Sequence, residues 1–279
     1  MTEAKINDAA ALTAAALQCD AAGRYEEAAP LYLRALELLD CESNADHPDL
    51  AVALMNLAGC YHQMGNLAEA EYHCVRALRI REKVFGTNHP LTALSVNNLA
   101  GIYRAQGRHT KAEQLYLRAL DLARKLYGPR HPAVATVLNN LGVLYKVKRS
   151  YESANRCLLT ALHILQTSLG PAHPNVASTL NNLAGLYCAR GRAILAEPLL
   201  RLALGIRMKN LGAMHPGVAD SLRNLANVCC SMDRPDDAEF YYREALAISE
   251  EMRDPIGPSI SHTQTALTPL SDAPNNRAR

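Results

Sequence analysis

Long apolar runs are absent from this sequence. None approaches the roughly 18 to 20 apolar residues that a helix needs to cross a membrane, so we expect no membrane-spanning segment. The first 20 residues, MTEAKINDAAALTAAALQCD, carry acidic and polar side chains where a secretory signal peptide has a basic stretch and then an apolar one. These absences predict a cytoplasmic protein without a membrane partner.

An excess of charge of either sign is also absent. The 29 basic and 27 acidic residues give a formal net charge of +2, so no surface for nucleic acid is indicated. The eight cysteines include no CxxC or other metal-ligand spacing, and most fall at apolar helical positions, where cysteine packs as a small hydrophobic residue. We therefore predict no metal site and no disulfide framework.

Signatures of catalysis are missing as well. The sequence has no GxGxxG, P-loop, HExxH or GxSxG motif, which are the commonest marks of cofactor, nucleotide, zinc and nucleophile sites. The acidic pairs Glu26-Glu27 and Asp236-Asp237 are expected in the first turn of a helix, where they interact favourably with its dipole. We predict a protein that is not an enzyme and needs no cofactor.

What the sequence does contain is one 15-residue motif repeated at a constant spacing. His173 to Tyr187 reads HPNVASTLNNLAGLY, and copies begin at His47, His89, His131 and His215, at steps of 42 residues. A catalytic motif normally occurs once, whereas a fixed period indicates an architectural unit. An alanine column raises the number of units to six: Ala28, Ala70, Ala112, Ala154, Ala196 and Ala238.

Each unit is predicted to form two helices. The proline after each histidine suits a first helical turn, and Val176, Leu180, Leu183 and Tyr187 recur at helical steps. Glycines that favour a left-handed conformation are expected at the helix ends: Gly23, Gly65, Gly107 and Gly191 after first helices, and Gly86, Gly128, Gly170 and Gly212 after second helices. Because almost no strand signal appears, the predicted fold is all-α.

The pattern Leu99-Ala100-x-x-Tyr103, followed by Ala112, resembles the tetratricopeptide repeat. The 42-residue version with NNLA and GxxHP resembles the repeats of kinesin light chains and their bacterial relatives, although the heptad segment that precedes the light-chain repeats is lacking. The resemblance implies an α-solenoid of six units, wound as a right-handed superhelix over residues 1–252. The expected units are 7–44, 45–86, 87–128, 129–170, 171–212 and 213–252.

The five repeated histidines are predicted to be structural. Equivalent residues of stacked units are expected to lie on the order of 10 Å apart, whereas zinc–nitrogen bonds are about 2 Å long, so these side chains cannot share an ion. Their position before proline in an inter-helix turn predicts hydrogen bonds to the loop backbone.

The repeated asparagines are the strongest candidates for a binding site. The second asparagine of the doublet forms an unbroken column, Asn56, Asn98, Asn140, Asn182 and Asn224, and the first occurs as Asn97, Asn139 and Asn181. For the second column, a structural bridge between units competes with a role in ligand binding. For the first column we predict contact with a ligand, because an amide both donates and accepts and can hold the backbone of an extended peptide. The resemblance to light-chain repeats points to the same three residues.

Two further repeat positions lie on the same helix face. One holds small residues in most repeats, and the other holds basic residues in some of them. Gly59, Gly101 and Gly185 indicate that either a ligand or a neighbouring helix approaches closely, since glycine inside a helix costs about 0.5–1 kcal/mol. The remaining predicted contact residues are Arg223, Arg104, Lys146, His62 and Asn227. Their charges suit carboxylates on a peptide, although ordinary solvated charges are an equally good interpretation.

The predicted function is a non-catalytic scaffold for protein–protein interaction that binds a peptide segment of a partner, with acidic groups, in the concave groove. The alternative is a self-associating assembly protein that forms a homodimer through the ends of the array. Residues 253–279, rich in Pro, Ser, Thr and Asn, are predicted to be a disordered tail, and its Ile260, Leu267 and Leu270 are candidates for covering apolar surface.

Overall fold

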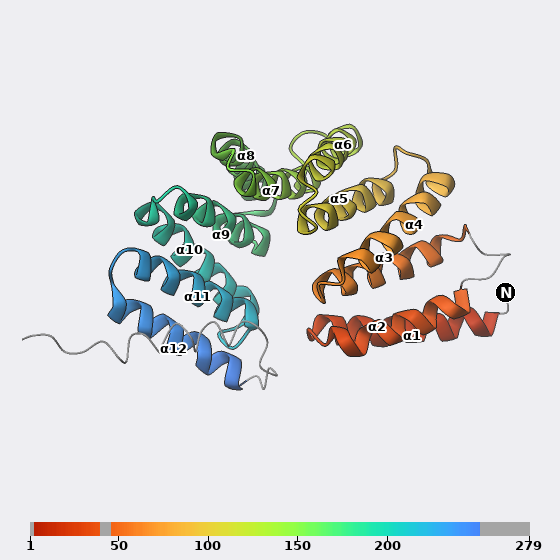
Figure 1. Ribbon diagram of the computed structural model, residues 1–279, viewed down its shortest axis with the longest axis horizontal. Coiled ribbons are helices and arrows are strands. Elements are labelled where there is room, and N and C mark those ends of the chain that lie inside the picture. The colour runs from red at the N-terminus through yellow and green to blue at the C-terminus, as the bar shows by residue number, and fades with distance from the viewer. Residues whose placement is uncertain (1–2, 40–45, 252–279) are drawn as a thin grey trace, which may run out of the picture. The chain divides into compact units, whose positions relative to one another are not determined.

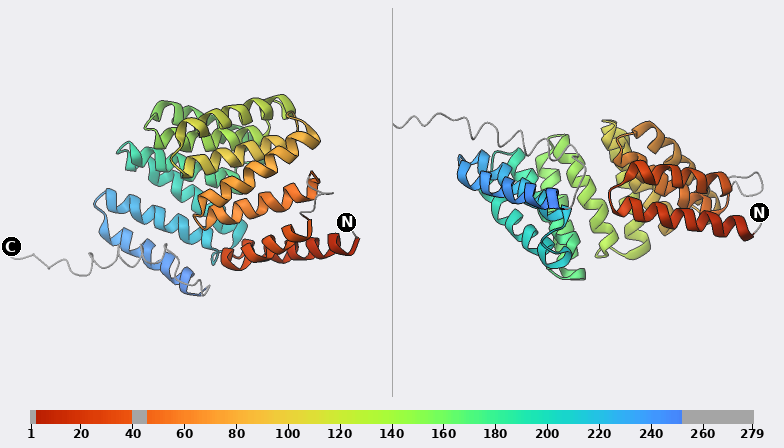
Figure 2. Two further views of the ribbon diagram at one scale, coloured as in Figure 1. Left: turned by 45° about the vertical axis from the view of Figure 1, so that its right-hand side comes forward. Right: turned by 90° about the horizontal axis from the view of Figure 1, so that it is seen from below.

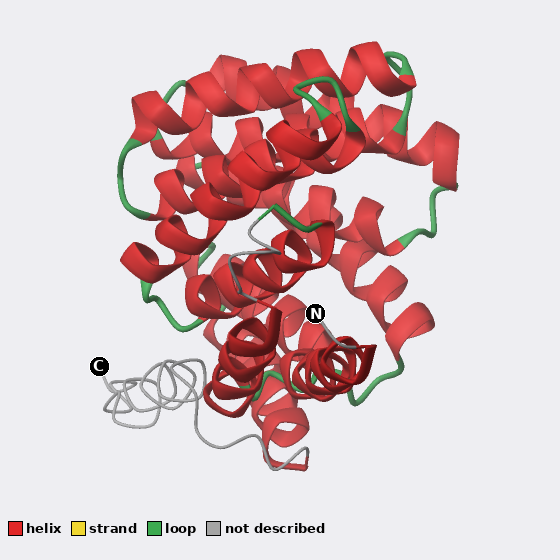
Figure 3. Cartoon of the chain, turned by 90° about the vertical axis from the view of Figure 1, so that its right-hand side faces the viewer, coloured by secondary structure: helices red, strands yellow, loops and turns green. Residues whose placement is uncertain are grey.

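The computed structural model describes residues 3–39 and 46–251, and all of their regular structure is helical (Figure 3). The predicted tail, and with it Ile260, Leu267 and Leu270, lies outside the described residues. Within the described ranges there are twelve helices (Figure 1): α1 (Glu3–Ala21), α2 (Tyr25–Leu39), α3 (Pro48–Gln63), α4 (Leu67–Phe85), α5 (Pro90–Ala105), α6 (His109–Tyr127), α7 (Pro132–Val147), α8 (Tyr151–Leu169), α9 (Pro174–Ala189), α10 (Ala193–Leu211), α11 (Pro216–Ser231) and α12 (Pro235–Glu251). The prediction of an all-α fold made of six helix-turn-helix units is confirmed.

The chain divides into two compact units, residues 1–144 and 145–279. In the first, α1 packs on α2, α3 on α4 and α5 on α6, while α2 also contacts α3 and α4 contacts α5. In the second, α9 packs on α10, α11 on α12, and α8 and α10 contact the helices that follow them. The hairpins α1–α2 and α11–α12 can be followed in both views of Figure 2. Within each compact unit, hairpins therefore stack on one another as in a solenoid.

The helices begin at histidine for a local chemical reason. His47, His89, His173 and His215 are the N-cap residues of α3, α5, α9 and α11, and each has an extended backbone with proline directly after it. The imidazole Nδ1 accepts a hydrogen bond from the amide two residues on, at 3.0–3.2 Å, and His131 does the same for Ala133 at 3.1 Å. This bond satisfies one of the amides that a helix start leaves unpaired. The predicted hydrogen bonding of these histidines to the backbone is confirmed.

The second helices end at glycines with an unusual backbone. Gly86, Gly128, Gly170 and Gly212 have φ of 82–87° and ψ of 157–174°. The positive φ agrees with the sequence prediction, but this ψ lies well outside the left-handed helical region, in a region that is essentially reserved for glycine. The chain is therefore extended, not helical, as it enters the turn before the next histidine.

The core consists of small and aliphatic side chains shared by successive helices. All six alanines of the repeat column are completely buried. In the second compact unit, Ala184 and Leu225 pack with Ala196 and Leu200, so the first helices α9 and α11 enclose α10. Because the buried side chain at each repeat position is small, consecutive helices approach closely and present their remaining faces at a regular spacing.

Candidate functional site

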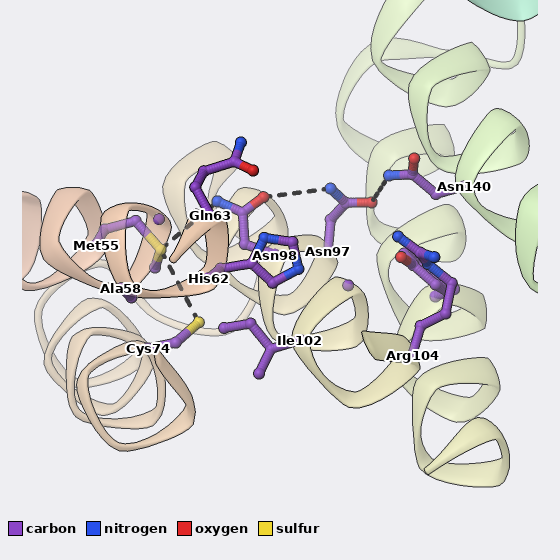
Figure 4. Close-up of a pocket in the computed structure, with 13 residues that line it drawn as sticks. Met55, Ala58, His62, Gln63, Cys74, Asn97, Asn98, Ile102, Arg104 and Asn140 are labelled. Atoms are coloured by element: carbon purple, nitrogen blue, oxygen red, sulfur yellow. Dashed lines mark hydrogen bonds between the residues drawn. The ribbon is translucent and has the colours of Figure 1, made fainter. Parts of the chain in front are cut away.

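Side-chain amides join successive first helices in the first compact unit. Asn140 on α7 donates to the Oδ1 atom of Asn97 on α5 at 3.0 Å, and Asn97 donates to Asn98 at 3.4 Å. Asn98 in turn donates to the sulfur of Met55 on α3 at 3.6 Å (Figure 4). The second compact unit repeats the first of these bonds, from Asn224 on α11 to Asn181 on α9 at 3.3 Å. The second asparagine therefore bridges neighbouring repeats in these three cases. Its acceptor lies at the first-asparagine position of the preceding repeat, which is asparagine for Asn140 and Asn224 and Met55 for Asn98.

These amides border a pocket of about 290 Å³ between α3 and α5. His62 and Gln63 on α3, Asn97 and Arg104 on α5, and Asn140 on α7 line it together with eight other residues, and Figure 4 shows their side chains around it. Burial, with a smaller contribution from Arg104, lowers the pKa of His62. The imidazole is therefore neutral at pH 7, and the charge that this pocket offers an anion comes from Arg104.

A second pocket, of about 410 Å³, lies among α9, α10 and α11 and includes Lys146 from the end of α7. It contains the same arrangement of amides 84 residues later in the sequence, since Asn181, Asn182 and Asn224 correspond to Asn97, Asn98 and Asn140. Lys146 supplies its cation, at the repeat position that His62 occupies in the first pocket. Each compact unit thus holds a pocket that combines the same three asparagine positions with one permanent positive charge, and the second pocket adds Asn227.

Two of the three mid-helix glycines lie beside the polar end of a long side chain of this chain. A Cβ atom at Gly185 would lie 3.3 Å from the ammonium of Lys146, and one at Gly101 would lie 3.5 Å from the hydroxyl of Tyr116. At Gly59 nothing lies within 4 Å. The distance at Gly101 is an ordinary van der Waals contact and the one at Gly185 is slightly tighter, so at most Gly185 leaves room for the end of a long side chain.

An apolar pocket of about 290 Å³ adjoins the first one across Asn97. Leu94 on α5, Tyr127 at the end of α6 and Val137 on α7 line it, and Asn97 is part of both linings. The side chain of Asn97 is 9% exposed. A chain lying across this asparagine would therefore meet amides and a guanidinium on one side and apolar carbons on the other. The asparagine pattern alone gave no sign of the apolar part.

The match to a known family extends along almost the whole described chain. The family model described as Tetratricopeptide repeat matches residues 7–73, 49–100, 92–167, 143–207 and 175–251. The chain belongs to the tetratricopeptide repeat family. No curated protein matches the sequence.

Solved structures of tetratricopeptide arrays resemble it over most of its length. BtubC (BKLC) from P. vanneervenii is 24% identical over 92% of this chain and 95% of that chain, with a TM-score of 0.62. A putative kinesin light chain from Podosopora anserina, with nearly identical TPR-like repeats, is 25% identical over 74% of this chain and 98% of that one, with a TM-score of 0.59. The predicted repeat type is confirmed. A Rap protein complexed with Competence and Sporulation Factor is 17% identical over 87% and 75% of the two chains, with a TM-score of 0.60, and shares the fold.

The predicted contact residues of this tetratricopeptide array divide between the two pockets. His62, Asn97 and Arg104 line the first, and Lys146, Asn181 and Asn227 line the second. Asn139 and Arg223 line neither. The guanidinium of Arg223 instead forms an ion pair with Asp220, one turn earlier on α11. The basic character expected along this face is therefore concentrated at Arg104 and Lys146.

Two other kinds of feature, membrane-spanning helices and metal-ligand clusters, are not found in the described part of the array. None of its helices is long and apolar enough to cross a membrane, and residues 3–39 and 46–251 contain no cluster of three potential metal ligands. Its cysteines are free thiols, of which Cys60, Cys74 and Cys229 are buried.

Proposed function

We propose that this tetratricopeptide array is a non-catalytic scaffold that binds an extended, acidic peptide segment of a protein partner through its asparagine-lined pockets. Arrays of this kind present extended binding surfaces built from successive repeats. The observation that carries the proposal is the recurrence, in both compact units, of three asparagines with a single permanent cation, Arg104 or Lys146.

The chemistry of the pockets suits a peptide better than a small metabolite. Amides can accept from and donate to a peptide backbone without selecting its side chains, and a guanidinium pairs with carboxylates through two parallel bonds. The apolar pocket beside Asn97 adds a place for a hydrophobic side chain next to the acidic one. The structure of a Rap protein in complex with Competence and Sporulation Factor supports the use of this fold in binding a regulatory factor.

The variant that tests the proposal must spare the inter-repeat bonds. Alanine at Asn97 or Asn181 would remove acceptors that hold neighbouring helices, so a loss of binding there could reflect loosened packing. The double substitution Arg104→Gln and Lys146→Gln instead removes both cations and keeps polar side chains of similar length. The control, Arg124→Gln with Arg156→Gln, changes the net charge equally at exposed positions of α6 and α8.

The assay is selection of binders from a random peptide library displayed on phage, followed by affinity measurement with the selected synthetic peptides. We expect the array and its control to select peptides enriched in Asp and Glu, with affinity falling as salt rises. The Arg104/Lys146 variant should bind those peptides at least tenfold more weakly. Selection of neutral peptides, or equal binding by both variants, would reject the proposal.

The self-associating alternative through the ends and tail remains a separate prediction. Its tail residues lie outside the described part of the chain.

A further inference from the structure

The outward face of α10 carries five exposed apolar residues, interrupted by the exposed cations Arg201 and Lys209. Ile194 is 76% exposed and Leu202 51% exposed, and Leu195, Pro198 and Met208 are also exposed. These five residues, called here the α10 face, lie along one side of a 19-residue helix. No described residue covers them, and contiguous apolar surface of this kind usually marks an interaction site.

The equivalent positions of other second helices can be compared with the α10 face. The five equivalent positions of α8, 42 residues earlier, are Glu152, Ser153, Arg156, Thr160 and Gln166. Those of α6 are Thr110, Lys111, Gln114, Arg118 and Arg124. Second helices of this array therefore normally present a polar outward face, and the apolar residues of α10 are not required by the fold.

The neighbouring helix α12 has the opposite charge. The exposed cations of α10 are Arg192 at its N-cap, Arg201 and Lys209, whereas α12 exposes Asp236, Asp237, Glu244 and Glu250 with the single cation Arg243 in its middle turns. Phe240, at the repeat position of Pro198, is 59% exposed on α12. Arg234, which directly precedes α12, forms an ion pair with Glu197 on α10 at 2.8 Å, and the Arg201 guanidinium lies 5.7 Å from the centroid of the Tyr241 ring on α12.

We propose that this combined surface binds a second copy of the chain, with α10 of one copy lying on α12 of the other. In a two-fold interface the same patch meets itself, so each residue pair occurs twice. A patch with an apolar, basic half and an acidic half that carries Phe240 is self-complementary under this operation. Apolar side chains then meet at the centre, and opposite charges meet at the edges.

The size of the patch sets the expected strength. Two neighbouring helices of this length, about 28 Å long and 8–10 Å apart, cover on the order of 500–600 Å² per copy, near the low end for specific interfaces. We therefore expect a reversible dimer with a dissociation constant in the micromolar range. This surface is made of second helices, so its use is independent of the asparagine-lined pockets.

The first experiment is sedimentation velocity of the full chain over a range reaching about 100 μM, a concentration that populates a dimer of micromolar affinity. The full chain should shift from monomer to dimer with concentration, and Leu202→Glu should remain monomeric. The control Leu117→Glu, at a similarly exposed leucine of α6, should dimerise as the unaltered chain does. A chain that stays monomeric throughout, or a Leu202→Glu variant that dimerises normally, overturns the proposal.

Charge-reversal variants distinguish binding of a second copy of this chain from binding of any other acidic partner. The variant Arg192→Glu with Lys209→Glu and the variant Glu244→Arg with Glu250→Arg should each be monomeric alone, because both contacts of the dimer become repulsive. Mixed together, they should form a heterodimer, since each reversed helix then meets its complement. Native mass spectrometry distinguishes the mixed species by mass, and failure of the mixture to pair contradicts the proposed arrangement.

Residues 252–279 are the remaining candidate occupant. If the full chain is monomeric and a chain ending at Glu251 dimerises, the C-terminal residues cover the patch in the intact protein, and the proposal is wrong for the full chain. Dimerisation of both chains with equal affinity supports it.

Discussion

The amide of Asn140 donates to the amide oxygen of Asn97, 43 residues earlier, and thereby ties α7 to α5 at 3.0 Å. The donor occupies the repeat position that is asparagine in all five copies of the motif. The acceptor occupies the preceding position, which is asparagine in only three of them. Asn97 is buried, so water cannot easily replace a lost donor. This pair connects the stacking of repeats to the lining of the first pocket.

Substitution of Asn140 by alanine is expected to destabilise the first compact unit. Removing the donor leaves the Oδ1 atom of Asn97 without this partner, at a cost of about 1–2 kcal/mol. Alanine at Asn97 alone should cost a similar amount, but the double variant should cost less than the sum, with a coupling of about 1 kcal/mol. Urea unfolding of the four proteins of this cycle measures that coupling, and additive effects would show that the bond contributes nothing.

Sequence periodicity captures what each repeat does by itself and misses what depends on its neighbours. The histidine caps could be predicted because donor and acceptor lie two residues apart. The acceptor of Asn140 could not, because its identity depends on the stacking of α5 and α7. The sequence column predicts Arg223 as a cation of the binding face, and the structure adds an ion pair with Asp220, three residues earlier. Helical spacing of the two charges was a signal available in the sequence.

A buried arginine provides a second test of how repeats are joined. Arg81 on α4 is 3% exposed and donates to the carbonyl of Leu91, at 3.2 Å, and to the hydroxyl of Ser95, at 2.8 Å. Arg207 makes the equivalent bonds to Gly217 and Ser221. Of the two repeats between them, one has Ala123 and Val137 at the same two positions and the other has Leu165 and Thr179, so an apolar pair can replace the polar one.

We therefore expect Arg81→Ala with Ser95→Val to be tolerated better than Arg81→Ala alone. The single change leaves a cavity and removes the guanidinium donor from the Ser95 hydroxyl and the Leu91 carbonyl, which remain bonded to each other at 3.0 Å, and we expect a loss of about 2–4 kcal/mol. In the double variant the hydroxyl is gone and the added methyl group fills part of the space, so the loss should fall by about 1 kcal/mol or more. The free energy of unfolding in urea is the measurement. A double variant that is less stable than the single one would contradict this view of the pair.

Two non-glycine residues occupy turn positions that glycine holds in the other repeats. Arg149 has φ of 60° and Asp233 has φ of 56°, while Gly23, Gly65, Gly107 and Gly191 occupy the same column. A side chain in this region costs roughly 1–2 kcal/mol. Arg149→Gly and Asp233→Gly should therefore each raise the unfolding free energy by about 1 kcal/mol, and Gly107→Ala should lower it by a similar amount. Thermal and urea unfolding measure all three, with Lys148→Gly, one position before the turn residue, as a control expected to stabilise nothing.

His73 should make the array sensitive to acid. Its ring is buried between Tyr61, stacked at 5.7 Å, and Tyr72, in edge contact at 5.0 Å. Burial lowers the pKa of His73, although Glu69 acts in the opposite direction, so the folded protein binds a proton at this site less readily than the unfolded chain does. The resulting stability is present above the unfolded pKa of about 6.5 and is lost as the pH falls through the lower folded value.

His73→Phe keeps an aromatic ring without a titrating group, so the difference in unfolding free energy between pH 7.5 and pH 5 should be smaller for this variant. The measurement is urea unfolding at several pH values. An equal loss of stability in both proteins would assign the acid sensitivity to other groups. His62 would then be the first to test, because burial and Arg104 lower its pKa as well.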